Sequence, residues 1–385
     1  MSKEKWRVPK LRFPGFTEDW EQRKLIYIFN DFIVPMRDKP KVFSGTTPWT
    51  RIEDIEGRYI NTSLSGQFVS DETIKSMNLK VIPKGSLIVS ASATFGVVAI
   101  VNNDLITNQT FIGLVPNKDF DIDFLYSLFE APTTKGKLLK LSAGSTIFYI
   151  ARESFENLVL SVPSKEEQIK ISKVFKSIDD SITLHQRKLN NLKLKKKALL
   201  QKLFPKNGER YPELRFPGFT DAWEQRKLSD ILKVNSGKDY KHLEQGDIPV
   251  YGTGGYMLSV NESLSNIDAI GIGRKGTIDK PQYLKAPFWT VDTLFYLTAL
   301  DKHSILFLYY LMQLMPWKKF DESTGVPSLS KTTIDNINGY VPSNPKEEEL
   351  ISALFNQLDK SITLHQRKLD HLQLQKKALL QQMFV

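Results

Sequence analysis

Apolar residues recur at alternating spacings of four and three along two long segments of this chain. The first segment runs from Glu166 to Phe204, contains neither Pro nor Gly, and is bracketed by Pro163 and Pro205. This spacing, held over several heptads, predicts a long helix with a single apolar seam. The seam positions are Ile171, Phe175, Ile178, Ile182, His185, Leu189, Leu192, Lys196, Leu199 and Leu203.

The second segment repeats the first. Ser181 to Leu189 returns letter for letter as Ser361 to Leu369. An exposed apolar stripe must be buried against something, and the repeated helix is the obvious partner. We therefore expect two copies related by a pseudo-two-fold axis, packed as an antiparallel coiled coil. The second seam is Ile351, Phe355, Leu358, Ile362, His365, Leu369, Leu372, Lys376, Leu379 and Met383.

Polar residues interrupt each seam at two positions. His185 and His365 could serve as ligands or proton shuttles, but a polar seam residue more often fixes the helix register, and we favour that role. Lys196 is expected to extend its ammonium group from the seam to solvent. The run from Lys193 to Lys197 fits a solvated face better than a phosphate-contacting edge. Ser164, three residues before Glu167, predicts a capping box at the helix start.

A second repeat lies upstream of each helix. Leu11 to Leu25 returns as Leu214 to Leu228, with only Glu18 and Asp19 changed. A period this long indicates a duplicated domain rather than a solenoid. The chain is therefore two halves with matching ends, and the first half is the longer.

The segments between these repeats, 26–163 and 229–342, contain short apolar runs bounded by turn residues, which predict strands. Both segments close on Val-Pro, at 162–163 and 341–342, so they share a frame while their interiors differ. The fold class expected is α+β. The predicted strands are 86–90, 97–101, 110–115, 269–272 and 293–298, and the predicted helices are 124–129 and 305–314.

The composition of the chain limits the classes of function that it can have. The chain has 385 residues and a formal net charge of +10, which favours a polyanion such as nucleic acid as partner. Cys is absent, which excludes disulfides, thiolate metal sites and a Cys nucleophile. The five His show no metal-ligand spacing, so no metal site is expected. We find neither a signal peptide nor an apolar run long enough to span a membrane, and expect a cytoplasmic protein.

The arrangement resembles the specificity subunit of type I restriction-modification enzymes over nearly the whole chain. The resemblance is carried by the upstream repeats at 13–25 and 216–228, the Val-Pro sites, and the helix segments at 196–201 and 376–381. The loop Tyr251-Gly-Thr-Gly-Gly255 and the turn Gly273-Arg-Lys-Gly276 also look like those of the family's recognition domains. The first half departs from this pattern, with Ser90-Ala-Ser-Ala-Thr94 where the second has Gly271-Ile-Gly-Arg-Lys275.

The resemblance implies two target-recognition domains, 1–163 and 207–342, joined by repeated helices at 164–206 and 343–385. Each domain is expected to bind one half of a split target in double-stranded DNA. The helices, about 50 Å long at ~1.5 Å per residue, would set the spacing, since a DNA turn is roughly 34–36 Å. Two methyltransferase subunits and two motor-nuclease subunits are the implied partners. They would form an adenine-N6 methyltransferase and site-specific deoxyribonuclease complex, with S-adenosylmethionine, ATP and Mg²⁺ in the partners.

Two other function classes compete with this one. A stand-alone DNA-modifying enzyme needs catalytic residues, but the Asn/Asp-Pro-Pro-aromatic loop of adenine methyltransferases is absent. The nuclease-like Asp239-Tyr-Lys241 occurs in only one half, and Gly271 to Gly276 matches a dinucleotide-binding pattern without a helix opening there. We therefore expect a non-catalytic chain with no cofactor of its own. The other rival is a coiled-coil interaction scaffold with no role on DNA.

Candidate DNA contacts follow from residue type and loop position. In the second half a basic and aromatic cluster precedes the Gly-rich loop, and Arg274 sits on a Gly-flanked turn, where an Arg can bind guanine through two hydrogen bonds. The second-half candidates are Lys238, Tyr240, Lys241, His242, Tyr251, Thr253, Arg274 and Lys275. The first-half candidates are Lys39, Lys41, Thr46, Thr47, Trp49, Arg51, Ser90, Ser92, Thr94, Ser145 and Thr146.

Overall fold

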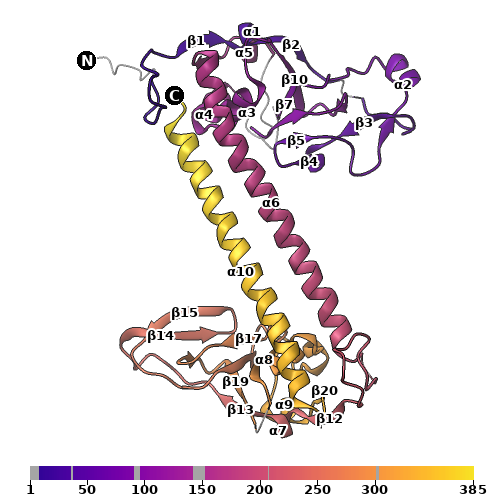
Figure 1. The fold of residues 1–385 in the computed structure, drawn as a ribbon, viewed down its shortest axis with the longest axis vertical. Helices are drawn as coiled ribbons and strands as arrows, with labels where there is room; N and C mark the ends of the chain where they lie inside the picture. Colours follow the sequence, from indigo (N-terminus) through magenta and orange to yellow (C-terminus); the bar gives the residue numbers. More distant parts are fainter. Residues whose placement is uncertain (1–7, 36–37, 91–95, 142–151, 207, 301–302) are drawn as a thin grey trace. The chain divides into compact units, whose positions relative to one another are not determined.

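The computed structural model of the chain describes residues 8–35, 38–90, 96–141, 152–206, 208–300 and 303–385 (Figure 1). The chain divides into two compact units. The first unit comprises residues 1–187 and 366–385, and the second comprises residues 188–365. Two long helices, α6 (Lys165–Leu203) and α10 (Pro345–Gln382), each contribute one half to either unit.

In the first unit, a mainly antiparallel sheet carries short helices and two small accessory sheets (Figure 1). The central sheet has the strand order β2-β10-β7-β8-β5-β4. The strands are β1 (Glu21–Lys24), β2 (Phe29–Ile33), β3 (Thr47–Thr50), β4 (Ile55–Glu56), β5 (Tyr59–Ile60), β6 (Phe68–Val69), β7 (Leu87–Ser90), β8 (Val98–Val101), β9 (Ile106–Thr107), β10 (Phe111–Pro116) and β11 (Val159–Val162). The helices are α1 (Leu25–Ile28), the 3₁₀ turn η1 (Ile52–Asp54), α2 (Asp71–Ser76), α3 (Ile122–Glu130), α4 (Pro132–Leu141) and α5 (Arg152–Glu156).

The second unit repeats this plan with a smaller central sheet, ordered β13-β19-β16-β17. A separate three-stranded sheet has the order β15-β14-β18. The strands are β12 (Glu224–Lys227), β13 (Leu232–Ser236), β14 (Gln245–Gly252), β15 (Gly255–Val260), β16 (Ala269–Gly273), β17 (Gln282–Leu284), β18 (Trp289–Thr290), β19 (Leu294–Ala299) and β20 (Asn338–Val341). The helices are α7 (Leu228–Ile231), α8 (Ile305–Leu314), the 3₁₀ turn η2 (Trp317–Phe320) and α9 (Lys331–Asn336).

The upstream repeat and the Val-Pro site of each half form one structural frame. Strand β1 pairs with β11 in antiparallel register, Glu21 opposite Val162, and β12 pairs with β20, Glu224 opposite Val341. In each half, the end of the upstream repeat and the segment before the Val-Pro site are therefore the two strands of one ladder. This ladder closes each domain just before its long helix begins.

A buried ion pair ties each upstream repeat to the start of the following helix. Arg12 Nε lies 2.7 Å from Glu167 Oε1, and Arg215 Nε lies 2.7 Å from Glu347 Oε1. The Ser164 hydroxyl accepts the Glu167 N–H at 3.4 Å, as the capping box predicts. The Glu167 carboxylate, however, binds Arg12 through both oxygens, which corrects its predicted return to the Ser164 backbone.

Each unit buries its own aromatic core, which includes the end of one long helix. In the first unit, Trp20 packs edge-on against Phe124 and against Phe384. The C-terminal end of the chain lies in this unit (Figure 1). In the second unit, Phe204 packs against Trp223 and Phe307. The C-terminal residues of the chain thus belong to the core of the N-terminal domain.

Within each unit the two helix halves pack against each other and run in opposite directions. Lys376 of α10 pairs with Asp179 of α6 in the first unit, and Lys196 of α6 pairs with Asp359 of α10 in the second, at 2.6 and 2.7 Å. Lys196 is therefore held in an ion pair, which corrects the prediction that its ammonium reaches solvent. The seam positions Ile182, His185, Leu189, Leu192, Ile362, His365, Leu369 and Leu372 are all buried or half-buried. The α+β fold with paired antiparallel helices is confirmed.

Candidate nucleic-acid interface

Several predicted DNA contacts of the second unit gather around strand β18. The Lys238 N–H donates to the Thr290 carbonyl at 2.9 Å, and the Trp289 indole donates to the Lys238 carbonyl at 2.9 Å. The His242 ring lies edge-on to Trp289, at 5.9 Å between centroids. Tyr251 of β14 stands opposite Thr290 in a parallel pair. One short strand thus anchors both the 238–242 loop and the start of the Gly-rich loop.

The Gly-rich loop meets the Arg-Lys turn. Thr253 lies at the turn between β14 and β15, and its hydroxyl is within 3.7 Å of where a Gly276 Cβ would be. The Arg274 N–H donates to the Thr293 carbonyl, and its own carbonyl accepts the Leu329 N–H. The backbone of this turn is therefore fixed on both sides, while the Arg274 and Lys275 side chains are exposed.

Fixed backbone and exposed cations suit contact with DNA. The Arg274 guanidinium lies 5.8 Å from the Phe295 ring centroid, which limits its range of positions. Lys238, Lys241 and His242 are exposed as well, whereas Tyr240 and Tyr251 are half-buried against a small apolar cluster. The structure therefore groups the second-half candidates into two adjoining sets, one at β18 and one at the Gly273–Gly276 turn.

In the first unit, the described candidates other than Ser90 lie on β3 or on the segments that flank it. Lys39 lies 5.4 Å above the Phe43 ring, and Lys41 and Thr46 are exposed. Thr47 is half-buried, and Arg51 donates to the Gln67 side chain at 2.8 Å. These positions leave the basic 38–47 segment accessible, and β3 pairs in parallel with β9 as β14 does with β18.

Two first-half predictions are corrected by burial. Trp49 is 3% exposed and packs with Val69, Leu79 and Ile106, so it belongs to the core of the β6-β3-β9 accessory sheet. Ser90 is 1% exposed at the end of β7. Neither side chain reaches DNA from this position. Ser92, Thr94, Ser145 and Thr146 fall outside the described residues.

The first unit also contains a buried cation that the sequence did not single out. Arg58 sits on the turn of the β4–β5 hairpin, is 2% exposed, and stacks on Tyr126 at 4.5 Å from its ring centroid. Its guanidinium lies 3.0 Å from Asp123 and 3.5 Å from Asp179. Nothing in the local sequence distinguishes Arg58 from a surface Arg, since its partners come from α3 and α6.

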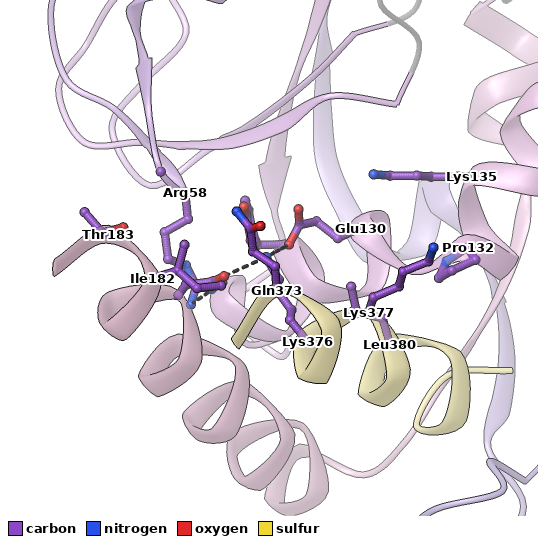
Figure 2. Close-up of a pocket in the computed structure, with 13 residues that line it drawn as sticks. Arg58, Glu130, Pro132, Lys135, Ile182, Thr183, Gln373, Lys376, Lys377 and Leu380 are labelled. Atoms are coloured by element: carbon purple, nitrogen blue, oxygen red, sulfur yellow. Dashed lines mark ion pairs between the residues drawn. The ribbon is translucent and has the colours of Figure 1, made fainter. Parts of the chain in front are cut away.

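Helix α10 completes this cluster. Lys376 pairs with Asp179 and with Glu130, beside a cavity of about 650 Å³ (Figure 2). Burial raises the pKa of Asp179 above its usual value, although Lys376 and Arg58 act in the opposite direction. The second unit has a simpler arrangement, in which Lys196 and the Tyr310 hydroxyl both bind Asp359. The Lys376–Asp179 pair therefore has an equivalent in the second unit, whereas Arg58 lies on the β4–β5 hairpin, which extends the central sheet of the first unit beyond that of the second.

We find no metal centre in the described ranges, where no three His, Asp or Glu residues are grouped suitably for an ion. The same ranges contain no helix that is both long enough and apolar enough to cross a bilayer.

Comparison with known proteins identifies the family of this chain. The family model described as "Type I restriction modification DNA specificity domain" matches residues 17–194 and again residues 220–374. These two matches cover most of the chain and coincide with its two halves. The chain belongs to this family.

Relatives in the specificity-subunit family match to different extents. The type I restriction enzyme MjaIX specificity subunit of Methanocaldococcus jannaschii is 30% identical over 251 residues, 59% of this chain and 55% of its own length. The chain thus spans about half the length of that relative. The EcoprrI specificity subunit of Escherichia coli is 23% identical over 377 residues, 91% of this chain and 90% of its own length.

A solved specificity-subunit structure shows the same fold. The S subunit of a type I restriction-modification system from M. genitalium aligns over 98% of this chain and 99% of its own, with a TM-score of 0.75 and 18% sequence identity. At 18% identity, the comparison shows a shared fold only. The residues that bind a target must therefore be argued from this chain's own loops.

Proposed function

We propose that this chain is the sequence-specific DNA-binding subunit of a type I restriction-modification complex, with each unit binding one half of a bipartite target. The main support for this proposal is that the two units share one frame but enclose different loops. The β1–β11 and β12–β20 ladders are equivalent, whereas the strands and loops that they enclose differ. One scaffold presenting two unlike surfaces suits a target with two unlike halves. The net charge of +10 and the exposed cations in both units support a nucleic-acid ligand.

Salt dependence of DNA binding separates this function from a protein-binding scaffold. Each phosphate neutralised by Lys or Arg releases counterions, so the logarithm of the binding constant should fall linearly with the logarithm of salt concentration. We expect a steep slope for the chain on duplex DNA, and a slope shallower by about one for a variant lacking one phosphate contact. Fluorescence anisotropy of labelled duplex DNA at several salt concentrations measures both slopes. A slope near zero would favour the scaffold.

The chain is further proposed to act without catalysis of its own, in the cytoplasm. Two methyltransferase subunits would bind S-adenosylmethionine, and two motor-nuclease subunits would use ATP and Mg²⁺. Exposed leucines on the long helices support paired methyltransferase docking. Leu184 and Leu374 of the first unit are 66% and 67% exposed, and Leu194 and Leu364 of the second are 66% and 52% exposed. Leu184 and Leu364 hold the same place in the identical repeat, as expected for a partner that binds twice.

Replacing both repeat leucines tests this docking. In Leu184→Gln with Leu364→Gln, we expect binding of the methyltransferase subunit to weaken by roughly tenfold or more, because burying one Leu contributes about 1.5–3 kcal/mol. Gln keeps the helix propensity close to that of Leu. The matched control is Lys188→Gln with Lys368→Gln, which alters exposed positions in the same repeats. Titration calorimetry measures both; equal affinities would place the docking surface elsewhere.

A further inference from the structure

The two contact loops of the second unit belong to two different sheets. Thr253 follows β14, in the sheet ordered β15-β14-β18, whereas Arg274 and Lys275 follow β16, in the sheet ordered β13-β19-β16-β17. Loops on separate sheets hold a fixed separation only if something joins them. Thr253 and Gly276 nevertheless lie in near contact, with 3.7 Å between the Thr253 hydroxyl and the place of a Gly276 Cβ.

Gln282 joins the two sheets. It lies on β17, opposite Gly271 of β16, and its side-chain amide donates to the carbonyls of Gly252 and Thr253 at 2.9 and 3.2 Å. A Gln amide nitrogen carries two N–H donors, and the two carbonyls that it contacts both belong to this loop. The side chain is half-buried, so these bonds are partly shielded from water. Gln282 thus holds the loop through its side-chain amide.

We propose that Thr253, Arg274 and Lys275 form one composite base-reading site and that Gln282 is its positioning residue. This inference rests on the proposed function and names where the second half of the target is read. Arg274 supplies a guanidinium fork that matches the O6 and N7 edge of guanine, and Thr253 supplies a hydroxyl. Discrimination between bases depends on hydrogen-bond geometry, while attraction to phosphates depends mainly on charge. Gln282 therefore affects which sequence is bound more than how tightly DNA is held.

The test maps N6-methyladenine in a methylation-free host that carries the chain with its methyltransferase subunit. Gln282→Met keeps the side-chain length and removes both hydrogen bonds. We expect methylation at sites mismatched in one half of the target to rise on the order of tenfold, since a single good base contact supplies about that much discrimination. The other half, bound by the first unit, should keep its sequence, which makes it an internal control. Gln225→Met, at an exposed position on β12, should leave both halves unchanged.

Other outcomes have distinct meanings. A uniform drop in methylation with both half-sites intact would show that Gln282 is only structural and overturn the inference. An unchanged map would overturn it as well. If Gln282→Met fails to accumulate, Gln282→Glu replaces it, because it keeps the shape while losing the donors, and the same rise in methylation at sites mismatched in one half is expected. A wild-type chain that yields no split target would contradict the proposed function itself.

Discussion

Replacing Arg58 by Met is expected to destabilise the first unit by about 3–5 kcal/mol, the cost of removing one partner from a buried ion cluster. The Arg58 guanidinium is 2% exposed and lies between Asp123 and Asp179 over the Tyr126 ring. Met fills much of the same volume, so the loss comes mainly from the charge. Asp179 would keep Lys376, but among the described residues Asp123 would retain as ion-pair partner only the half-exposed Lys176, at 3.5 Å.

Urea denaturation measures this loss of stability. Hydrogen exchange then assigns it to a unit, since peptides from β7 and β10 report the stability of the first unit and peptides from β16 and β19 that of the second. The matched control is Arg23→Met in the same unit. Arg23 lies 2.8 Å from Glu21, but the two side chains are 42% and 62% exposed, so its loss should cost no more than about 1 kcal/mol. Equal effects of the two substitutions would contradict the assignment of Arg58 as a buried structural cation.

Replacing Phe384 by Ala is expected to destabilise the N-terminal domain by about 3–5 kcal/mol, although it lies one residue from the C-terminal Val385. Its ring is 3% exposed and lies 6.1 Å from Trp20, 5.8 Å from Phe124 and 5.6 Å from Phe175. Removing it leaves a cavity where the upstream repeat, α3 and α6 meet.

The repeat provides a matched comparison for this prediction. Phe204 holds the equivalent place in the second unit, 5.8 Å from Trp223 and 5.3 Å from Phe307. Phe204→Ala should therefore destabilise the second unit, whereas Phe384→Ala should destabilise the first. Leu374→Ala, at a 67% exposed position, should change stability by about 0.5 kcal/mol or less. Exchange protection that fell in the second unit for Phe384→Ala would contradict the division of the chain.

Local patterns in the sequence were enough to predict the regular elements. The heptad spacing predicted a helix over 166–204, and α6 spans Lys165–Leu203. The apolar run at 305–314 coincides with α8, and the predicted strands at 86–90 and 269–272 correspond to β7 and β16. Each of these signals depends on neighbours within one element, which the sequence shows directly.

Contacts between distant segments could not be predicted in the same way. The repeats showed that residues 11–25 and the Val-Pro site have counterparts in both halves. They did not show that β1 and β11 are paired strands. Trp49 looked like a loop aromatic because its burial depends on Val69, Leu79 and Ile106 from elsewhere. Arg58 and Gln282 were missed for the same reason, since their partners lie on other elements.

We propose that this chain carries two unlike DNA-reading domains on one repeated frame. The most direct test is genome-wide mapping of N6-methyladenine in a methylation-free host that carries this chain and its methyltransferase subunit. We expect methylation at a target of two short half-sites separated by an unspecified spacer. Exchanging residues 229–342 for the corresponding segment of another specificity subunit should then change one half-site only. If no new methylation is found while the same methyltransferase is active beside another specificity subunit, this chain does not direct methylation.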